Sequence, residues 1–115
     1  MAQVKWQKRA ENELYRYLVK GFLEFGETTA NNFAATVAQI NDDLGKFPEI
    51  GFPEPLLKGR KRLYRTRHIL KRFKLIYYYA KSSDTVHIAD IWDKNEVNPK
   101  SWTQLNGSQC NGNSV

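Results

Sequence analysis

Cysteine and long apolar runs are both scarce in this sequence. The single cysteine, Cys110, excludes a disulfide within the chain and a cysteine-based zinc site. No run approaches the roughly 18 apolar residues that a membrane span needs. The opening residues, MAQVKWQKRAENE, contain no apolar segment of the kind found in secretory signals. We therefore expect a reducing, cytoplasmic setting without membrane attachment.

Acidic residues are missing between Glu54 and Asp84, although the whole chain has 12 of them. From Lys58 to Lys74 the same stretch carries nine lysines or arginines, half of the 18 in the chain. Such a local concentration of positive charge is typical of a surface that binds a polyanion, and nucleic acid is the obvious one. The alternative is a solvated edge strand, because lysine and arginine also protect sheet edges from aggregation.

Two apolar stripes at helical spacing predict a pair of helices in the first half of the chain. The first helix is expected from about Ala10 to Phe25, ending at Gly26. The second is expected to be capped by Thr28 or Thr29 and to end at Gly45. The short connection between them predicts an antiparallel helical hairpin. The stripes are Leu14, Leu18, Phe22 and Phe25 in the first helix, and Phe33, Val37, Ile40 and Leu44 in the second.

Strands are expected on both sides of this hairpin. One lies near Val4–Trp6, and the others follow a proline-rich loop over residues 46–57 and span Arg62–Ile69, Phe73–Lys81 and Thr85–Trp92. The order β-α-α-β-β-β predicts an α+β fold, with the hairpin packed on one face of a mainly antiparallel sheet. We expect one domain over residues 1–102 and a disordered polar tail over residues 103–115.

The basic residues of the expected strands suggest a site. Arg65 and Arg67 are two residues apart and therefore point to one face of their strand, while Lys74 lies one strand over, after a turn near residues 70–72. If the two strands pair, these cations are expected to converge on one patch. His68 has a pKa suited to proton transfer, but its place in the strand puts it on the other face from the two arginines.

Other residues allow both a functional and a structural interpretation. His87 is interpreted as packed, as is His68 unless it is the proton acceptor. The tyrosines 77–79 resemble a base-stacking platform, although inward-facing ones belong to a core. Asp90 and Asp93 resemble a paired carboxylate site, but further ligands of suitable spacing are lacking, so we expect neither a metal nor a cofactor.

Four segments together resemble the RelE/ParE superfamily of toxins from bacterial type II toxin–antitoxin systems. They are VKWQKRAENEL at the start, Pro48-Glu-Ile-Gly51 in the loop, LYRTRHI with FKLIYYYAKSSDTVHIADIWD in the strands, and the closing IWDKNEVNP. The resemblance covers about Val4 to Trp102. It implies growth arrest of the host cell and neutralisation by an antitoxin encoded nearby.

The resemblance also implies roles for particular residues. RelE-like members cut messenger RNA on the ribosome, with cations that orient the RNA and stabilise charge on the phosphorane. By position, the implied catalytic residues are Arg65, Arg67, Lys74 and Lys94. The implied or expected nucleic-acid contacts are Lys61, Arg62, Arg72 and Trp102. Arginines replace the usual lysines of the second strand and are poor general bases, so His68 and Glu96 are the candidate bases.

Three functions remain open from the sequence. The basic residues favour a ribosome-dependent endoribonuclease. ParE-like members of the family instead poison DNA gyrase without enzymatic activity, and the scarcity of general bases keeps that alternative open. The third function is a nucleic-acid-binding domain that has no effect on growth.

Overall fold

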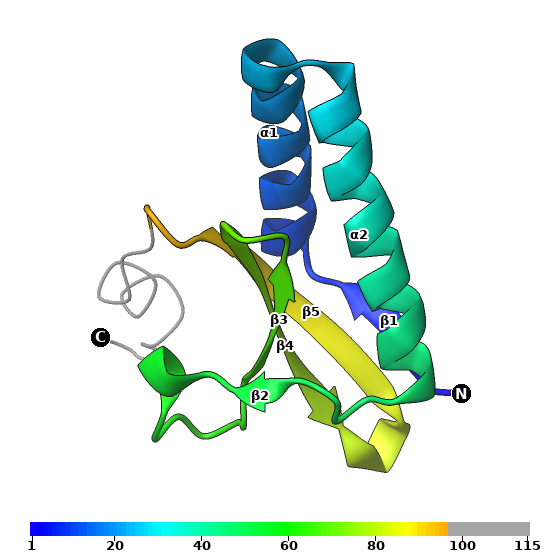
Figure 1. Cartoon of the computed structure of the whole chain (residues 1–115). Coiled ribbons are helices and arrows are strands. Elements are labelled where there is room, and N and C mark those ends of the chain that lie inside the picture. The colour runs from blue at the N-terminus through cyan, green and yellow to red at the C-terminus, as the bar shows by residue number, and fades with distance from the viewer. Residues whose placement is uncertain (97–115) are drawn as a thin grey trace.

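Five strands form a single sheet in the computed structural model, which describes residues 1–96 (Figure 1). The strands are β1 (Gln3–Trp6), β2 (Phe52–Pro53), β3 (Arg65–Ile69), β4 (Phe73–Ala80) and β5 (Thr85–Asp93), and their order in the sheet is β1-β5-β4-β3-β2. β1 runs parallel to β5, and all other neighbours are antiparallel. The α+β class and the mainly antiparallel sheet are thus confirmed. Trp102 and the predicted tail lie outside the described residues.

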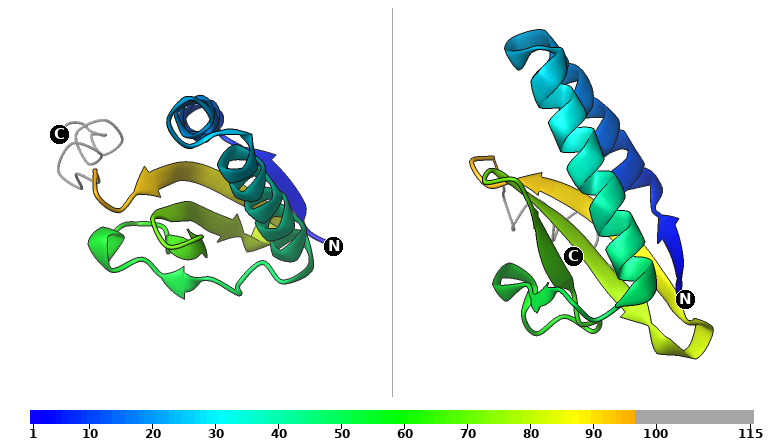
Figure 2. Two further views of the ribbon diagram at one scale, coloured as in Figure 1. Left: turned by 45° about the horizontal axis from the view of Figure 1, so that its top comes forward. Right: turned by 45° about the vertical axis from the view of Figure 1, so that its right-hand side comes forward.

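Two long helices, α1 (Lys8–Phe25) and α2 (Glu27–Lys46), form the expected hairpin on one side of the sheet (Figure 2). The whole predicted stripe of α2 is buried. The predicted stripe of α1 is only half right, because Leu14 and Leu18 pack partly on the core while Phe22 and Phe25 are 54% and 60% exposed. The reason is that this end of the hairpin extends past the sheet (Figure 1).

The helix ends differ from the predicted ones. Gly26, at φ 93°, ends α1 and also begins α2, so that Thr28 and Thr29 lie inside the second helix rather than capping it. Gly45 does not end α2 but is buried within it, and its carbonyl accepts a hydrogen bond of 2.8 Å from the Ala2 N–H. A Cβ on Gly45 would lie 3.3 Å from Met1 Cε. The absent side chain lets the start of β1 approach α2.

The loop predicted between the helices and the strands is not wholly irregular. It contains β2, which pairs with β3, and a single 3-10 turn over Pro55–Leu57. β2 is two residues long and lies at the edge of the sheet. Its position agrees with the rule that proline within a sheet is confined to edge strands. The strand predicted from Arg62 begins only at Arg65.

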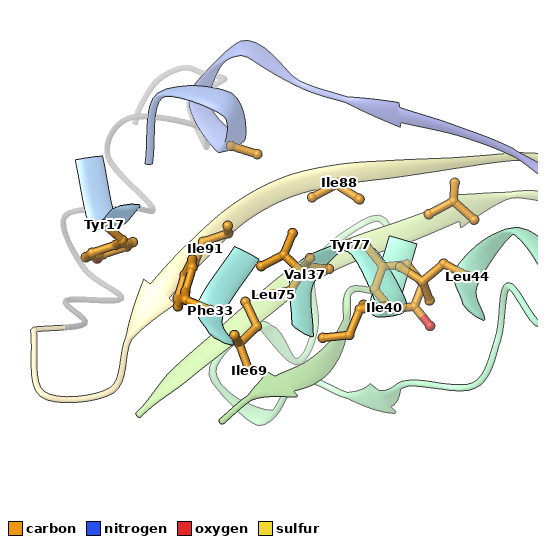
Figure 3. Packing of buried hydrophobic residues seen from close by; sticks show 12 residues of the cluster. Tyr17, Phe33, Val37, Ile40, Leu44, Ile69, Leu75, Tyr77, Ile88 and Ile91 are labelled. Atoms are coloured by element: carbon orange, nitrogen blue, oxygen red, sulfur yellow. The ribbon is translucent and has the colours of Figure 1, made fainter. Parts of the chain in front are cut away.

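Apolar side chains fill the space between the helices and the sheet (Figure 3). The helical contribution centres on the stripe of α2, and the sheet contributes Ile69, Leu75, Tyr77, Ile88 and Ile91. A second, smaller cluster lies on the opposite face of the sheet and consists of Leu57, Ile76 and Trp92, with Tyr64 packed beside them. Both faces of β4 and β5 are therefore buried in part, whereas the helices cover only one.

Candidate functional site

The pairing of β3 with β4 separates the predicted catalytic cations. Arg65 is opposite Tyr77 and Arg67 is opposite Leu75, both of which belong to the core beneath the helices. Lys74 is instead opposite His68 and points to the other face. The prediction that Arg65 and Arg67 share a face is confirmed, and so is the opposite orientation of His68. The expected convergence of Lys74 with the two arginines is wrong.

Arg65 is engaged with the loop that precedes β2. Its Nη1 donates hydrogen bonds to the carbonyl oxygens of Gly51 at 2.9 Å and Glu49 at 3.2 Å. Its Nη2 lies 3.6 Å from the Glu49 carboxylate, and its side chain is 17% exposed. In this arrangement the guanidinium group holds the chain rather than an external ligand.

Arg67 differs from Arg65, because within residues 1–96 no comparable ion pair holds it. Its Nε is buried and has no hydrogen-bond partner, and within residues 1–96 no carboxylate forms an ion pair with it. Its positive charge is therefore uncompensated by the described part of the protein, and an anion could compensate it.

Lys74 is tied to a buried acid that the sequence analysis did not single out. Its Nζ lies 2.9 Å from Oε1 of Glu54, and the two side chains are 15% and 0% exposed. The other Glu54 oxygen accepts a hydrogen bond of 3.0 Å from the Leu56 N–H. The Lys74 Nζ also lies 5.5 Å from the centroid of the Trp92 ring. Lys74 is thus half of a largely desolvated ion pair.

His68 lies beside this pair and is exposed. Desolvation, followed by the positive charges of Lys94 and Lys74, lowers the pKa of its imidazole below 6.5. The backbone N–H of Lys94 donates to the Arg72 carbonyl at 2.8 Å, which places the start of the segment after β5 next to the β3–β4 turn. We call His68, Lys74 and Lys94 the His68 cluster. It contains a neutral proton acceptor next to two cations.

The remaining acids of this region are each paired with a basic residue. Arg72 donates three hydrogen bonds of 2.7–3.0 Å to Asp93, and although burial opposes the shift, these bonds lower the pKa of Asp93. Burial raises the pKa of Asp90, which accepts a hydrogen bond of 2.8 Å from Arg9. Glu96 is paired with Lys20 at 3.1 Å on α1, so its role as a base is not supported.

The paired-carboxylate interpretation of Asp90 and Asp93 also fails on geometry. Each carboxylate has its own arginine, and no group of three potential metal ligands exists within residues 1–96. Arg72, predicted to contact nucleic acid, braces β5 through its ion pair with Asp93.

Two of the four expected contact residues, Lys61 and Arg62, fall at the other end of the sheet from the His68 cluster. Lys61 is exposed in the segment before β3, and the Arg62 guanidinium lies 4.6 Å from the centroid of the Tyr78 ring. Tyr77 is fully buried, and its hydroxyl accepts a hydrogen bond of 2.8 Å from the Gly51 N–H. Of the three consecutive tyrosines 77–79, Tyr78 is the one whose ring lies on the face that the helices leave open.

Within residues 1–96, neither helix has the length and apolarity that crossing a membrane requires.

Comparison with solved structures agrees with this architecture. A chain of the chromosomal ParDE toxin–antitoxin system from P. aeruginosa is 16% identical, with a TM-score of 0.64, and the match covers 81% of this chain and 96% of that one. A metal-bound toxin from Helicobacter pylori is 17% identical, with a TM-score of 0.63 and coverages of 85% and 100%. The isolated E. coli RelE toxin is 12% identical, with a TM-score of 0.56 and coverages of 90% and 95%. At these identities the likeness shows the fold alone.

The comparison with curated proteins finds no match. The decisive comparison is with protein families, where residues 4–97 match the model of the ParE toxin of the type II toxin–antitoxin system parDE. This match spans the sheet and both helices. The chain therefore belongs to the family of ParE toxins of type II toxin–antitoxin systems.

Proposed function

We propose that this toxin arrests growth by cleaving RNA, and that the His68 cluster is its catalytic centre. The observation that carries the proposal is the position of His68, which is exposed and neutral at about pH 7 and lies beside Lys74 and Lys94. Arginines stand where a lysine base is usual in RelE-like members. In this proposal His68 accepts the proton in their place.

The reaction needs only groups of this cluster. The imidazole of His68 accepts the proton of a ribose 2′-hydroxyl, whose oxygen attacks the adjacent phosphorus. The bond to the 5′-oxygen breaks, giving a 2′,3′-cyclic phosphate, and the departing oxygen takes a proton from a neighbouring ammonium group. Lys74 and Lys94, the two cations of the cluster, stabilise the negative charge of the phosphorane. Arg67 lies on the helix side of the strand, and its positive charge adds to those that lower the pKa of His68 rather than contacting the phosphorane.

The partner proposed to control this activity is an antitoxin encoded nearby. Membership of a type II toxin–antitoxin family supports such a partner. The positive net charge of +6 favours an acidic segment in the antitoxin.

The test is to induce the toxin briefly in a bacterial host and map the ends of messenger RNA. We expect new ends inside translated reading frames, at least tenfold fewer of them with His68→Gln, and no change with Lys46→Gln at the C-terminal end of α2. Melting temperatures and capture by the antitoxin show whether the variants fold. Unchanged cutting by a folded His68→Gln variant would remove His68 from the mechanism.

A second candidate, poisoning of DNA gyrase, is favoured by a different observation. Lys74 is neutralised by Glu54, and Arg65 is engaged with the loop before β2, so two of the four predicted catalytic cations already have internal partners. The family match to ParE points the same way, because ParE-like members are the gyrase poisons of the superfamily. Growth arrest with intact messages and accumulated gyrase–DNA cleavage complexes would establish this function and refute RNA cleavage.

A further inference from the structure

A row of rings crosses the open face of the sheet at the end remote from the His68 cluster. Tyr78 of β4 is opposite His87 of β5, and His87 is opposite Lys5 of β1. Tyr64, just before β3, lies on the other side of Tyr78. We call Lys5, Tyr64, Tyr78 and His87 the Tyr78 row. The helices do not cover it, since they pack on the opposite face of the sheet (Figure 2).

The rings of this row are arranged for stacking. Tyr78 and His87 are stacked, with centroids 4.9 Å apart and planes at 19°, and Tyr64 meets Tyr78 edge-on at 5.6 Å. The Arg62 guanidinium lies 4.6 Å from the Tyr78 centroid, and Arg62 is exposed. The hydroxyls of Tyr77 and Tyr79 make hydrogen bonds of 2.8 and 2.6 Å within the protein, whereas the Tyr78 hydroxyl accepts a longer one of 3.4 Å from the Gln7 amide.

A groove runs along Tyr78 and is predominantly cationic. It has a volume of about 320 Å³, within the range of ligand sites, and Arg62, Arg65 and Lys81 line it. Its one carboxylate, Glu49, lies 3.6 Å from both Arg65 and Lys81 and cannot balance all the cations. With Lys5 at the far side of the row, four cations face one acid.

We propose that the Tyr78 row and its groove form a binding site for single-stranded nucleic acid. One base enters between the Tyr78 ring and the planar guanidinium of Arg62, which now contacts that ring directly, and Lys5 and Lys81 contact the flanking phosphates. Stacking on an aromatic ring beside cations that follow the backbone is how proteins hold single strands without reading their sequence. The site is separate from the His68 cluster and does not depend on the growth-arrest target proposed above.

The test is fluorescence anisotropy of the purified full chain with a labelled oligothymidylate and the matching oligouridylate, each of about 12 nucleotides. Replacing Tyr78 by leucine should weaken binding about tenfold, whereas the control Tyr15→Leu, at an exposed tyrosine on α1, should leave it unchanged. Arg62→Gln should weaken binding more than Lys46→Gln, which removes the same charge elsewhere. Preference for one of the two oligonucleotides identifies DNA or RNA as the ligand.

Equal binding by Tyr78→Leu and Tyr15→Leu would overturn the proposal and leave only diffuse electrostatic attraction. Failure of both oligonucleotides to bind would also overturn it, even if the row captured an acidic protein segment. A measurement on the unmodified chain covers the case of a Tyr78→Leu variant that does not fold. Ring protons of His87 should shift in the NMR spectrum when the oligonucleotide is added, and their invariance would refute stacking at this row.

Discussion

The ion pair between Lys74 and Glu54 allows a test of whether Lys74, which we place in the catalytic centre, also stabilises the fold. We consider Lys74→Met, which keeps most of the unbranched side chain and removes the charge. The Glu54 carboxylate, 0% exposed, then keeps its hydrogen bond from the Leu56 N–H but loses its only ion pair within residues 1–96. It becomes a buried charge without a compensating cation.

The expected cost follows from that burial. Removing one partner of a buried ion pair costs about 3–5 kcal/mol, since the remaining charge is desolvated and unpaired. Lys74 is 15% exposed, so some water reaches the site and the lower end of the range applies. A loss of about 3 kcal/mol corresponds to a melting temperature about 12–24 °C lower for a domain of this size.

Urea and thermal unfolding of four proteins measure this cost: the unmodified chain, Lys74→Met, Glu54→Gln and the double variant. Glutamine keeps an acceptor for the Leu56 N–H without the charge, so the double variant should be more stable than Lys74→Met alone. The control is Lys46→Met, which breaks an exposed i,i+4 pair with Asp42 and should cost no more than about 0.5 kcal/mol.

Two results would refute a stabilising role for the Lys74–Glu54 pair. One is a loss of less than about 1 kcal/mol in the free energy of unfolding of Lys74→Met. The other is a double variant whose loss equals the sum of the losses in Lys74→Met and Glu54→Gln. Lys74 would then be a cation that Glu54 does not hold. Loss of toxicity in a fully stable Lys74→Met variant would favour a direct contact with substrate.

Three further predictions concern the loop before β2 and the two histidines. Gly51→Ala should destabilise the fold by about 2 kcal/mol, measured by urea unfolding. The reason is that the new Cβ would lie 2.7 Å from the Thr66 carbonyl oxygen and 2.8 Å from the Tyr77 ring. An unchanged free energy of unfolding would mean that the loop can move. Tyr77→Phe should cost about 1–3 kcal/mol in the same assay by leaving the buried Gly51 N–H unpaired, and a stability equal to that of the unmodified chain would contradict this. The pKa values of His68 and His87 are both lowered from 6.5, chiefly by desolvation, so the unfolded chain binds more protons in the window just below that value. The free energy of unfolding should therefore fall as the pH drops through about 6.5 and recover above it, and a variant with glutamine at both positions should show a flatter profile.

The elements of the fold could be predicted because each has its own local pattern. The stripe of α2 recurs at helical spacing and is buried along its whole length. The outer end of α1 has the same spacing, but its burial depends on how far the sheet extends, which no local pattern records. β2 could not be found either, since a two-residue strand that ends in a proline has no periodicity.

The faces of the sheet were partly predictable as well. Strand parity places Arg65 and Arg67 together and His68 opposite, as the structure shows. A turn at residues 70–72 pairs Ile69 with Phe73, and from that pairing Lys74 must lie opposite His68. The predicted turn thus already implied the separation of Lys74 from the two arginines. Which face the helices cover, by contrast, depends on tertiary packing.

Charge density along the sequence overstates charge density on the surface of this protein. Acids that lie outside the basic stretch in the sequence pair with its basic residues in the fold. Glu54 neutralises Lys74, Asp93 holds Arg72, and Glu49 lies beside Arg65. These three acids reduce the net positive charge of the surface that the sequence predicts to bind a polyanion. The cations to which we assign ligand contacts lie at two separate places, Lys74 and Lys94 beside His68, and Arg62, Lys81 and Lys5 around Tyr78. One has a proton acceptor and the other a stack of rings, so the same basic stretch supports two sites with different chemistry.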